Sequence, residues 1–493
     1  MSDKTMKSAN IRSSSLILAA LLAAGMITSC GGSSETVQDD WQTAEYTAEA
    51  EETAAETGNN IIIKDDLPDL DLSGRQMNVL VREEIGYEFS ADLDGEVVND
   101  AVYERNRRIG ERFNIDLNYV LKPGTWDFRD EYQKLVTGSV LAGDDAYQIV
   151  TGQSNIVLPL AAQNVFLDVS DPEYIDFSKP YWKNGYHDSI RINGRMYSLC
   201  GDYALTTLSE TTVMFFNKPS MENRGLDYPY DSVKNGSWTL DKLNSLCAGL
   251  YEDINGDSVR NTDDFYGFSA YYLSVCSFAN SLRSNVIRKN SEGVPVVNFP
   301  TEYDLTVFDS MQSVYDNEYF WFTTESDMPG EFMSGNRMII AMFLKGAEKL
   351  RNMDIDYGII PYPKFDENQD DYISSIIRRF TVAAVPITVG DPSISELVME
   401  ALACEGYNLV RPAYLEVALK SKYSRDAETG EMLDIISSTQ YFDIADAFYS
   451  EIESVGDFMG EALAKHTGLS GWFSSVQKKT EKNLEKILEN YYD

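Results

Sequence analysis

Short apolar runs alternate with longer amphipathic stretches in the first part of the chain. Residues 77–81 and 115–121 favour strands, because aliphatic side chains fill the first and alternate with polar ones in the second. Residues 97–113 and 126–141 place apolar side chains at roughly helical spacing. A third strand is expected at residues 147–150. Strands that alternate with helices of this length predict βαβ units and a largely parallel sheet.

The pattern toward the C-terminus is less regular but contains both kinds of element. Thr239 suits the N-cap of a helix, so a helix is expected at residues 240–251. Apolar runs predict the remaining elements: strands at 211–216, 355–360 and 380–386, a buried strand or helix at 338–344, and mainly helix from residue 395 onward. The chain therefore belongs to the α/β class.

The first 29 residues have the features of an export signal. Basic residues end at Arg12, and residues 16–27 form an apolar run without a charge. A run of this length suits the hydrophobic segment of a signal peptide and is too short to span a bilayer. It continues into Ile27–Gly31, which resembles the lipobox of bacterial lipoproteins. We therefore expect Cys30 to be the lipidated residue and the lipid to be the only membrane anchor.

Residues 30–72 predict a solvated tether between this anchor and a globular body. The segment is rich in Ser, Thr, Ala and Glu and carries a net charge of −11. It has too little apolar surface to offset the entropy of ordering the chain, and like charges keep it extended. The body is expected to begin near Ser73.

The charge balance excludes several classes of partner. The chain has 79 acidic and 41 basic side chains and a net charge of −38. Nucleic-acid binding requires clustered Lys and Arg, so we expect no nucleic-acid partner. The acid excess also disfavours anionic membranes and polyanionic substrates that bind through bulk charge.

The sequence lacks the common catalytic motifs. It contains no P-loop, no H-E-x-x-H and no G-x-S-x-G, and its two histidines, His187 and His466, suit structural or surface positions. The four cysteines beyond Cys30 have spacings that fit no zinc motif, and buried free thiols are expected at Cys200, Cys247, Cys276 and Cys404. We expect no catalytic residue, no catalytic cofactor and no enzymatic activity.

One acidic loop has the spacing of a calcium site. Calcium prefers six to eight oxygen ligands, and alternate positions of a tight loop can supply them. The loop places side-chain oxygens at positions 1, 3, 5, 9 and 12 and a main-chain carbonyl at position 7: Asp253, Asn255, Asp257, Asn261, Asp264 and the carbonyl of Val259. The spacing resembles EF-hand-like loops of the dockerin type, although Ser258 replaces the usual Gly and Arg260 the usual apolar residue. A structural calcium ion is expected, and an Asn-Gly turn with solvated acids is the alternative.

Six short segments form an ordered set of motifs between residues 97 and 364. They are Val97–Arg107, Asn193–Tyr197 with Gly201-Asp202 after it, Phe215–Lys218, Trp238–Asp241, Phe332–Arg337 and Tyr357–Lys364. In this order they resemble the extracellular solute-binding proteins of bacterial ABC importers, in the sugar-binding branch. Residues 424–434 extend the likeness toward the C-terminus.

The resemblance implies a two-lobed α/β fold of the type II periplasmic-binding-protein kind, with a ligand cleft between the lobes. It implies a first lobe of residues 73–209 and 374–445 and a second lobe of residues 210–373 and 446–493. Two or three crossing segments would form a hinge, and the lobes would close around the solute. The permease would recognise the closed form. Some members of the family carry an EF-hand-like calcium loop.

Candidate ligand residues follow from the chemistry of sugars. Sugar sites combine aromatic platforms with carboxylate, amide and guanidinium groups. The candidates are Trp126 and Trp321 as platforms, Gln153 beyond the third strand, Asp202 and Tyr203 after the hairpin, and Arg378 and Arg379 before the returning strand. Core packing is the alternative for the tryptophans. Surface charge or an ion pair that locks the lobes is the alternative for Arg379.

These patterns predict a monomeric substrate-binding lipoprotein of an ABC transporter, anchored on the extracytoplasmic face of the cell membrane. It would capture an oligosaccharide and deliver it to a permease. A lipid-anchored carbohydrate-active enzyme, either a glycoside hydrolase or a lyase, is the first alternative, because a pair of carboxylates suffices for sugar cleavage. A surface adhesin is the second.

Overall fold

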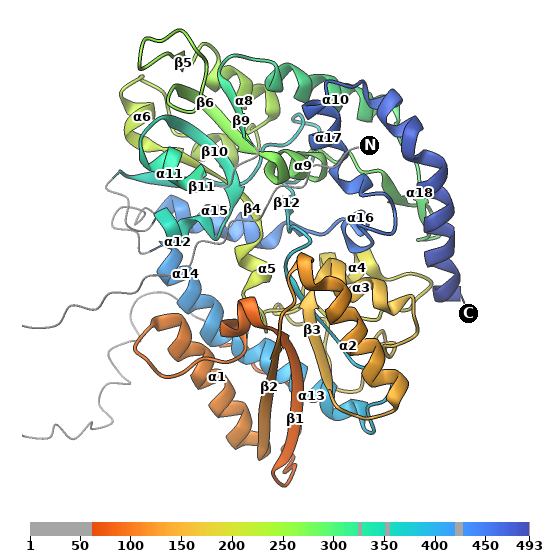
Figure 1. The fold of residues 1–493 in the computed structure, drawn as a ribbon. Helices are drawn as coiled ribbons and strands as arrows, with labels where there is room; N and C mark the ends of the chain where they lie inside the picture. Colours follow the sequence, from red (N-terminus) through yellow and green to blue (C-terminus); the bar gives the residue numbers. More distant parts are fainter. Residues whose placement is uncertain (1–61, 324–327, 351–354, 420–426, 493) are drawn as a thin grey trace, which may run out of the picture. The chain divides into compact units, whose positions relative to one another are not determined.

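The structure, a computed structural model, describes residues 62–323, 328–350, 355–419 and 427–492 (Figure 1). The predicted export signal, Cys30 and most of the predicted tether lie outside these residues. The described strands form two main sheets and two short two-stranded pairs.

The first sheet has four strands in the order β13-β3-β1-β2. The strands are β1 (Arg75–Arg82), β2 (Ile115–Lys122), β3 (Ile149–Gln153) and β13 (Thr381–Ala384). β1 runs parallel to both β2 and β3, whereas β13 pairs with β3 antiparallel. The helices α1 (Val97–Phe113) and α2 (Arg129–Ala142) connect the three parallel strands. The βαβ units predicted from the hydrophobic pattern are therefore confirmed.

The second sheet has the order β11-β4-β10-β6-β5, and β9 also pairs with β6. Its strands are β4 (Thr212–Asn217), β5 (Tyr251–Glu252), β6 (Phe265–Tyr271), β9 (Phe320–Thr323), β10 (Arg337–Phe343) and β11 (Tyr357–Ile360). β6 runs parallel to β9 and β10, and the other pairs are antiparallel. The second sheet is therefore mixed, with β4 and β5 antiparallel to their neighbours, and no parallel sheet had been predicted from these residues.

Three chain crossings join the two sheets. The first is α5 (Thr206–Ser209), which leads into β4; the second is β12 (Ser374–Ser375), which leads toward β13; the third contains β14 (Gln440–Tyr441). β12 and β14 pair in parallel, and Thr211 bridges to Ile376. The Gln440 amide donates to the Thr207 carbonyl at 2.7 Å and to Thr211 Oγ1 at 2.8 Å. The crossings therefore form one hydrogen-bonded hinge.

The remaining helices surround these sheets and the hinge. They are α3 (Ser154–Ala161), α4 (Asn184–Ile190), α6 (Lys218–Glu222), α7 (Tyr230–Lys234), α8 (Leu240–Cys247), α9 (Tyr272–Ser281), α10 (Glu302–Tyr315), α11 (Met328–Met333), α12 (Gly346–Leu350), α13 (Pro392–Glu405), α14 (Arg411–Leu419), α15 (Ala427–Ser438), α16 (Ile444–Ala447), α17 (Phe458–Ala464) and α18 (Leu469–Tyr492). Short 3-10 turns occupy Glu83–Glu88, Trp126–Phe128 and Val455–Asp457, and a π-helical turn occupies Gly406–Val410. β7 (Ile287–Lys289) and β8 (Pro295–Val297) form a small hairpin.

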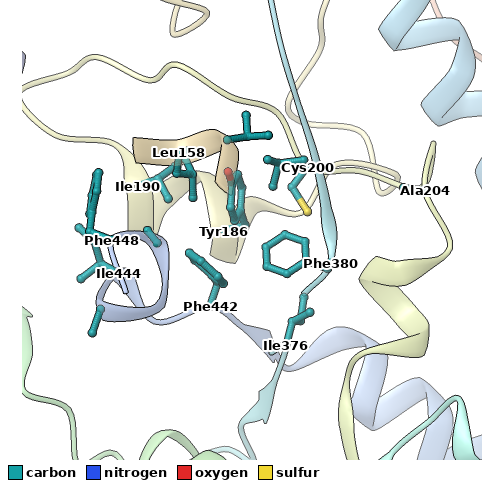
Figure 2. Packing of buried hydrophobic residues seen from close by; sticks show 14 of the residues in the cluster. Leu158, Tyr186, Ile190, Cys200, Ala204, Ile376, Phe380, Phe442, Ile444 and Phe448 are labelled. Atoms are coloured by element: carbon teal, nitrogen blue, oxygen red, sulfur yellow. The ribbon is translucent and has the colours of Figure 1, made fainter. Parts of the chain in front are cut away.

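An aromatic cluster packs beside the hinge (Figure 2). Tyr186 of α4 contacts Phe380 and Phe442, with ring centroids 5.6 and 5.2 Å apart, and Phe380 meets Phe442 at 5.0 Å. Each of the three side chains is at most 1% exposed. Because Phe380 follows β12 and Phe442 follows β14, this packing fixes two crossings against the first sheet's helices.

Residues 62–72, which were predicted to belong to the tether, pack on the body. Ile63 exchanges hydrogen bonds of 3.0 and 2.7 Å with the Asn408 side chain, and Asp65 pairs with Arg112 at 2.7 Å. The side chains that pack partly buried against the core are Ile63, Leu67, Leu70 and Leu72. Burial of these four apolar side chains stabilises the packing of residues 62–72 on the body.

Two further expectations differ from the structure. The helix expected at residues 240–251 begins after Thr239, which caps it by accepting a hydrogen bond from Lys242, but it ends at Cys247. The chain turns there, with Gly249 in the left-handed region, and Tyr251 joins β5. In addition, α15 packs against β11 of the second sheet, although its residues lie in the range predicted for the first lobe.

The expectation for the cysteines is confirmed, since Cys200, Cys247, Cys276 and Cys404 are free and buried. Among the described residues, none of the helices combines the length and apolarity needed to span a membrane.

Candidate functional site

Polar side chains meet at the carboxyl ends of the first sheet's parallel strands. Arg82 ends β1 and Gln153 ends β3, so the parallel pairing places both residues at the same edge. Arg82 donates to Gln153 Oε1 at 3.3 Å and to the Arg379 carbonyl at 2.7 Å. Its side chain therefore ties this edge of the sheet to the second crossing. Open α/β sheets bind ligands beyond the carboxyl ends of their strands.

Glu88 lies fully buried beside this edge and links three segments. One carboxylate oxygen accepts from the Thr206 amide, and the other accepts from Thr381 Oγ1 at 2.9 Å. Burial raises the pKa of Glu88, and the Arg82 guanidinium opposes that shift. The carboxylate thus joins the first crossing to β13 and holds Arg82 in place.

The second sheet presents its own strand ends to the same crossings. Tyr271 ends β6 and Phe343 ends the parallel strand β10, and their rings meet nearly perpendicular with centroids 5.6 Å apart. Arg379 lies over Phe343 at 5.2 Å and reaches the Tyr271 hydroxyl at 3.4 Å. Residues of the second crossing therefore contact strand ends of both sheets.

Glu210 contacts two cationic side chains, Lys345 and Arg379, beside these strand ends. It accepts from Lys345 Nζ at 2.5 Å and lies 3.5 Å from an Arg379 nitrogen. The carboxylate is largely buried, whereas the side chains of Arg379 and Lys345 are 37% and 40% exposed. Burial lowers the pKa of Lys345, while Glu210 opposes the shift. The two cations retain donors that a polar solute can reach.

Trp126 and Tyr449 form an aromatic pair beside the hinge. Trp126, just after β2, meets Tyr449, which follows α16, edge to face with centroids 5.7 Å apart. The Tyr449 ring covers Arg378 at 3.8 Å, and its hydroxyl donates to Asp457 Oδ2 at 3.0 Å. Both rings are partly exposed. They provide apolar faces next to the charged groups of the hinge.

Arg378 is buried between two carboxylates and packs against the Tyr449 ring. It donates to both oxygens of Asp457, at 2.8 and 3.0 Å, and to Asp446 at 3.0 Å. Burial opposes its charge, but the two carboxylates outweigh burial and raise the pKa of Arg378. Burial also raises the pKa of Asp446, to about 7, although Arg378 opposes this. Arg378 acts as the support of Tyr449.

The predicted ligand residues fall into two groups. Trp126, Gln153, Arg378 and Arg379 lie at or directly behind the strand ends and crossings. Asp202, Tyr203 and Trp321 lie elsewhere: Asp202 pairs with Lys183 at 2.8 Å, Tyr203 is fully buried with its hydroxyl on the Leu199 carbonyl, and Trp321 stacks on Tyr266 at 5.1 Å. In this conformation packing and ion pairing account for the second group.

Several residues of the site were not singled out from the sequence. They are Arg82, Glu88, Glu210, Tyr271, Lys345 and Tyr449. For Arg82 and Lys345 a signal was present, because each directly follows an apolar strand run, where strand ends face a ligand. Glu210 and Tyr449 carried no comparable signal, since their roles depend on how distant crossings meet.

The predicted calcium loop has the turns that its spacing suggested. Asp253 accepts from the amides of Gly256 and Ser258 at 2.7 and 2.8 Å, and Asp257 accepts from the Val259 amide at 2.7 Å. Ser258 adopts a φ of 61°, the left-handed conformation for which Gly is usual at this position. The unusual serine is therefore compatible with the loop geometry.

Asp264 at position 12 has an orphaned oxygen. The residue is fully buried; its Oδ2 accepts from the Asn261 amide at 3.0 Å and the Tyr251 hydroxyl at 3.1 Å, while Oδ1 has no partner. A buried carboxylate oxygen without a donor suits a cation, so the donor set fits calcium. Within the described part of the chain, three or more His, Cys, Asp or Glu side chains nowhere gather closely enough to hold a metal by themselves. A calcium ion would depend on Asn255, Asn261 and the Val259 carbonyl as well.

Comparisons with known proteins identify the fold. The sequence matches no protein-family model and no curated protein. Among solved structures, a cyclo/maltodextrin-binding protein complexed with maltotetraose aligns with a TM-score of 0.53 and 13% identity, over 85% of this chain and 96% of that one. UspC of M. tuberculosis aligns with a TM-score of 0.54 and 11% identity, over 83% and 100%. The chain therefore has the two-lobed α/β fold of periplasmic-binding-protein-like proteins.

Proposed function

We propose that this protein is the substrate-binding lipoprotein of an ABC importer and that it captures an oligosaccharide. The observation that carries the proposal is the meeting of aromatic and cationic side chains at the strand ends of both sheets, directly against the hinge. Trp126, Tyr271 and Tyr449 offer partly exposed rings, and Arg379 and Lys345 offer charged donors. Sugars require this combination, because their ring faces are apolar and their rims carry hydroxyls.

Hinge closure would convert solute binding into a transport signal. The groups that would contact the solute come from both sheets and from the crossings, so a bound solute gains contacts when the lobes approach each other. A ligand shifts a conformational equilibrium only by its difference in affinity for the two states. Contacts made from both sides at once would supply that difference, and the permease would then recognise the closed form.

The remaining parts of the proposal concern anchoring and calcium. Lipidation at Cys30 would place a monomeric receptor on the extracytoplasmic face of the cell membrane. The calcium ion would be held by the loop from Asp253 to Asp264, far along the chain from the proposed solute residues, and its contribution would be structural. Neutralising the loop's acids with a divalent ion would reduce their mutual repulsion.

The test is a binding screen followed by product analysis. The purified protein is titrated with maltooligosaccharides, other oligosaccharides, monosaccharides, peptides and polyamines while its thermal unfolding is followed. A tight ligand at about 100 times its Kd should stabilise the protein by about 2.7 kcal/mol and be recovered intact. Cleavage of the stabilising sugar would overturn the receptor proposal and indicate a glycoside hydrolase or lyase. Stabilisation by peptides or polyamines alone would overturn the assignment of the solute.

A further inference from the structure

A second pocket lies against the hinge, away from the residues assigned to the solute. It has a volume of about 460 Å³ and is lined by residues of α4, β7 and the second and third crossings. The charged and polar lining residues are Asp188, Ser189, Arg283, Asn285, Arg288, Lys289 and Tyr441. Three of these are cationic, in a chain with a net charge of −38. Such a local reversal of sign is a signature of anion recognition.

Two of the donors have no partner among the described residues. The Arg283 guanidinium makes no hydrogen bond or ion pair there, and the residue adopts a φ of 54°, which is uncommon for a residue other than Gly. The Tyr441 hydroxyl likewise has no hydrogen-bond partner in the described part of the chain. Burial raises the pKa of Tyr441, the Asp443 and Asp446 carboxylates add to that rise, and Arg288 and Arg283 oppose it. Arg283, Arg288 and Tyr441 all line this one pocket.

The other two cations are partly engaged but keep donors. Arg288 pairs with Asp304, at 2.5 Å for the closest contact, and Asp304 is fully buried and held also by Ser284 and Thr301. Lys289 donates to the carbonyls of Asp188 and Arg191, the latter at 2.7 Å, so its charge is not matched by a carboxylate contact. A guanidinium has five N–H donors and an ammonium three, so both retain capacity for a ligand.

Two acidic side chains face the pocket region and limit its charge. Asp188 is exposed on α4, and Asp443 is buried, where it accepts from Asn285 Nδ2 at 3.0 Å and caps α16 through the Ala445 amide. Asp443 is thus already satisfied by hydrogen bonds. The Arg283 guanidinium and the Tyr441 hydroxyl are therefore the pocket donors left without a partner among the described residues.

We propose that this pocket binds a small oxyanion, such as a phosphate, sulfate or carboxylate group, and that the bound anion restrains the hinge. Arg283 would grip its oxygens as a fork, Arg288 and Lys289 would supply positive charge, and Tyr441 would donate its hydroxyl. Tyr441 belongs to β14 and Ile373 precedes β12, while Lys289 reaches across to the end of α4. One anion would therefore connect both hinge strands to elements on either side of them.

Calorimetric titration with inorganic phosphate, in buffer of constant ionic strength, tests the site without any solute. Sulfate and acetate arms distinguish the kind of oxyanion. Arg283→Gln and Tyr441→Phe should each weaken phosphate binding about tenfold or more, which corresponds to about 1.4 kcal/mol. Arg75→Gln, which removes an arginine at the start of β1 outside this pocket, should leave binding unchanged. Absence of binding up to about 10 mM phosphate would overturn the site, because a Kd above that value means a binding free energy weaker than about 3 kcal/mol. Equal phosphate affinity of the wild type and all variants would also overturn it.

Hydrogen exchange tests the effect on the hinge. Saturating phosphate should slow amide exchange at residues 373–376 and 438–444 in the wild-type protein but not in Arg283→Gln. Binding without any change in exchange would refute the restraint of the hinge. Neither measurement depends on which solute the protein carries. The anion site can therefore be refuted without refuting the proposed transport function, and the reverse also holds.

Discussion

Trp126 and Tyr449 lie 323 positions apart in the sequence, yet their rings meet at 5.7 Å and 77° beside the hinge. Trp126 follows a strand of the first sheet and is itself covered by Arg129 at 4.4 Å. Tyr449 rests on Arg378, which the Asp446 and Asp457 carboxylates hold. The contact therefore joins an aromatic edge on one side of the hinge to a rigid ionic support on the other.

Replacing Trp126 should weaken solute binding. Trp126→Ala removes an aromatic face from the proposed site, and such contacts contribute about 0.5–1.5 kcal/mol beyond area burial. We expect about a tenfold loss of affinity, measured by calorimetry with the sugar found in the binding screen. Trp321→Phe serves as the control, because Trp321 stacks on Tyr266 away from the hinge. A larger loss of affinity from Trp321→Phe than from Trp126→Ala would contradict this placement of the site.

Removing the Arg378 charge should destabilise the fold. Arg378→Met leaves Asp446 and Asp457 buried without their cation, and breaking a buried pair in this way costs about 3–5 kcal/mol. Chemical denaturation of the variant should show this loss in the free energy of unfolding. Arg378→Lys keeps a charge but not the bidentate geometry, so an intermediate loss is expected. Equal stability of the wild type and Arg378→Met would show that the carboxylates do not depend on the guanidinium.

Mild acid should destabilise the protein through His187. This residue is buried, its Nε2 accepts from the Cys200 amide at 3.0 Å, and burial lowers the pKa of His187 to about 3. The unfolded chain takes up a proton near its ordinary pKa of about 6.5, whereas the folded chain does not. The free energy of unfolding therefore falls as the pH drops below about 6.5, by about 2 kcal/mol at pH 5.

A non-titrating variant isolates that effect. His187→Gln retains an acceptor for the Cys200 amide but cannot be protonated in this range. Urea titrations at pH 7 and pH 5 should show a smaller loss of stability for the variant than for the wild type. Parallel curves for the two proteins would mean that other groups cause the acid sensitivity.

Calcium should stabilise the protein through the loop from Asp253 to Asp264. Calcium bound only to the folded form raises the free energy of unfolding by mass action, about 2.7 kcal/mol at 100 times the Kd. Chelation should remove the stabilisation, and Asp253→Asn should abolish the response to calcium. Asp263→Asn changes an acid between the expected ligands and should respond as the wild type does. A melting temperature unaffected by chelator would argue against the ion.

Truncation to Ser73 should lower stability more than truncation to Ile62. The segment between them buries apolar side chains and contributes the Asp65–Arg112 ion pair. Burial of one aliphatic side chain contributes about 1.5–3 kcal/mol when it is complete, so several partly buried ones should add to a loss of a few kcal/mol. Thermal unfolding of the two bodies measures the difference. Equal melting temperatures would show that the packed segment contributes nothing to the free energy of unfolding.

Much of the fold was predictable from the local spacing of hydrophobic residues along the chain. The strands β1, β2, β4 and β10 and the helix α1 occur within two residues of the ranges expected from their hydrophobic spacing. Periodicity is a property of neighbouring residues, so it survives in any tertiary setting that buries one face. The end of α8 and the placement of α15 were not accessible in this way, because the first depends on a turn at Gly249 and the second on a partner strand far away in sequence.

The proposed site was only partly visible in the sequence. Gln153 and Arg379 were found because they flank apolar runs at strand boundaries, and Trp126 because tryptophan before a helix is conspicuous. Asp202 and Tyr203 satisfied the same kind of reasoning, yet the structure gives them an ion pair and a fully buried position. Residue type and local spacing do not distinguish a side chain that faces solvent from one that faces the core.

The sequence by itself determined the α/β class, the alternation of strands and helices from β1 to β3 and the spacing of the acidic loop. Each depends on side chains within a few positions of one another or on composition. The tertiary structure alone decided the antiparallel pairs of the second sheet, the pairing of β12 with β14 in the hinge and the meeting of Trp126 with Tyr449. These contacts join residues tens to hundreds of positions apart, and their partners are selected by the packing of the whole core and not by any local preference.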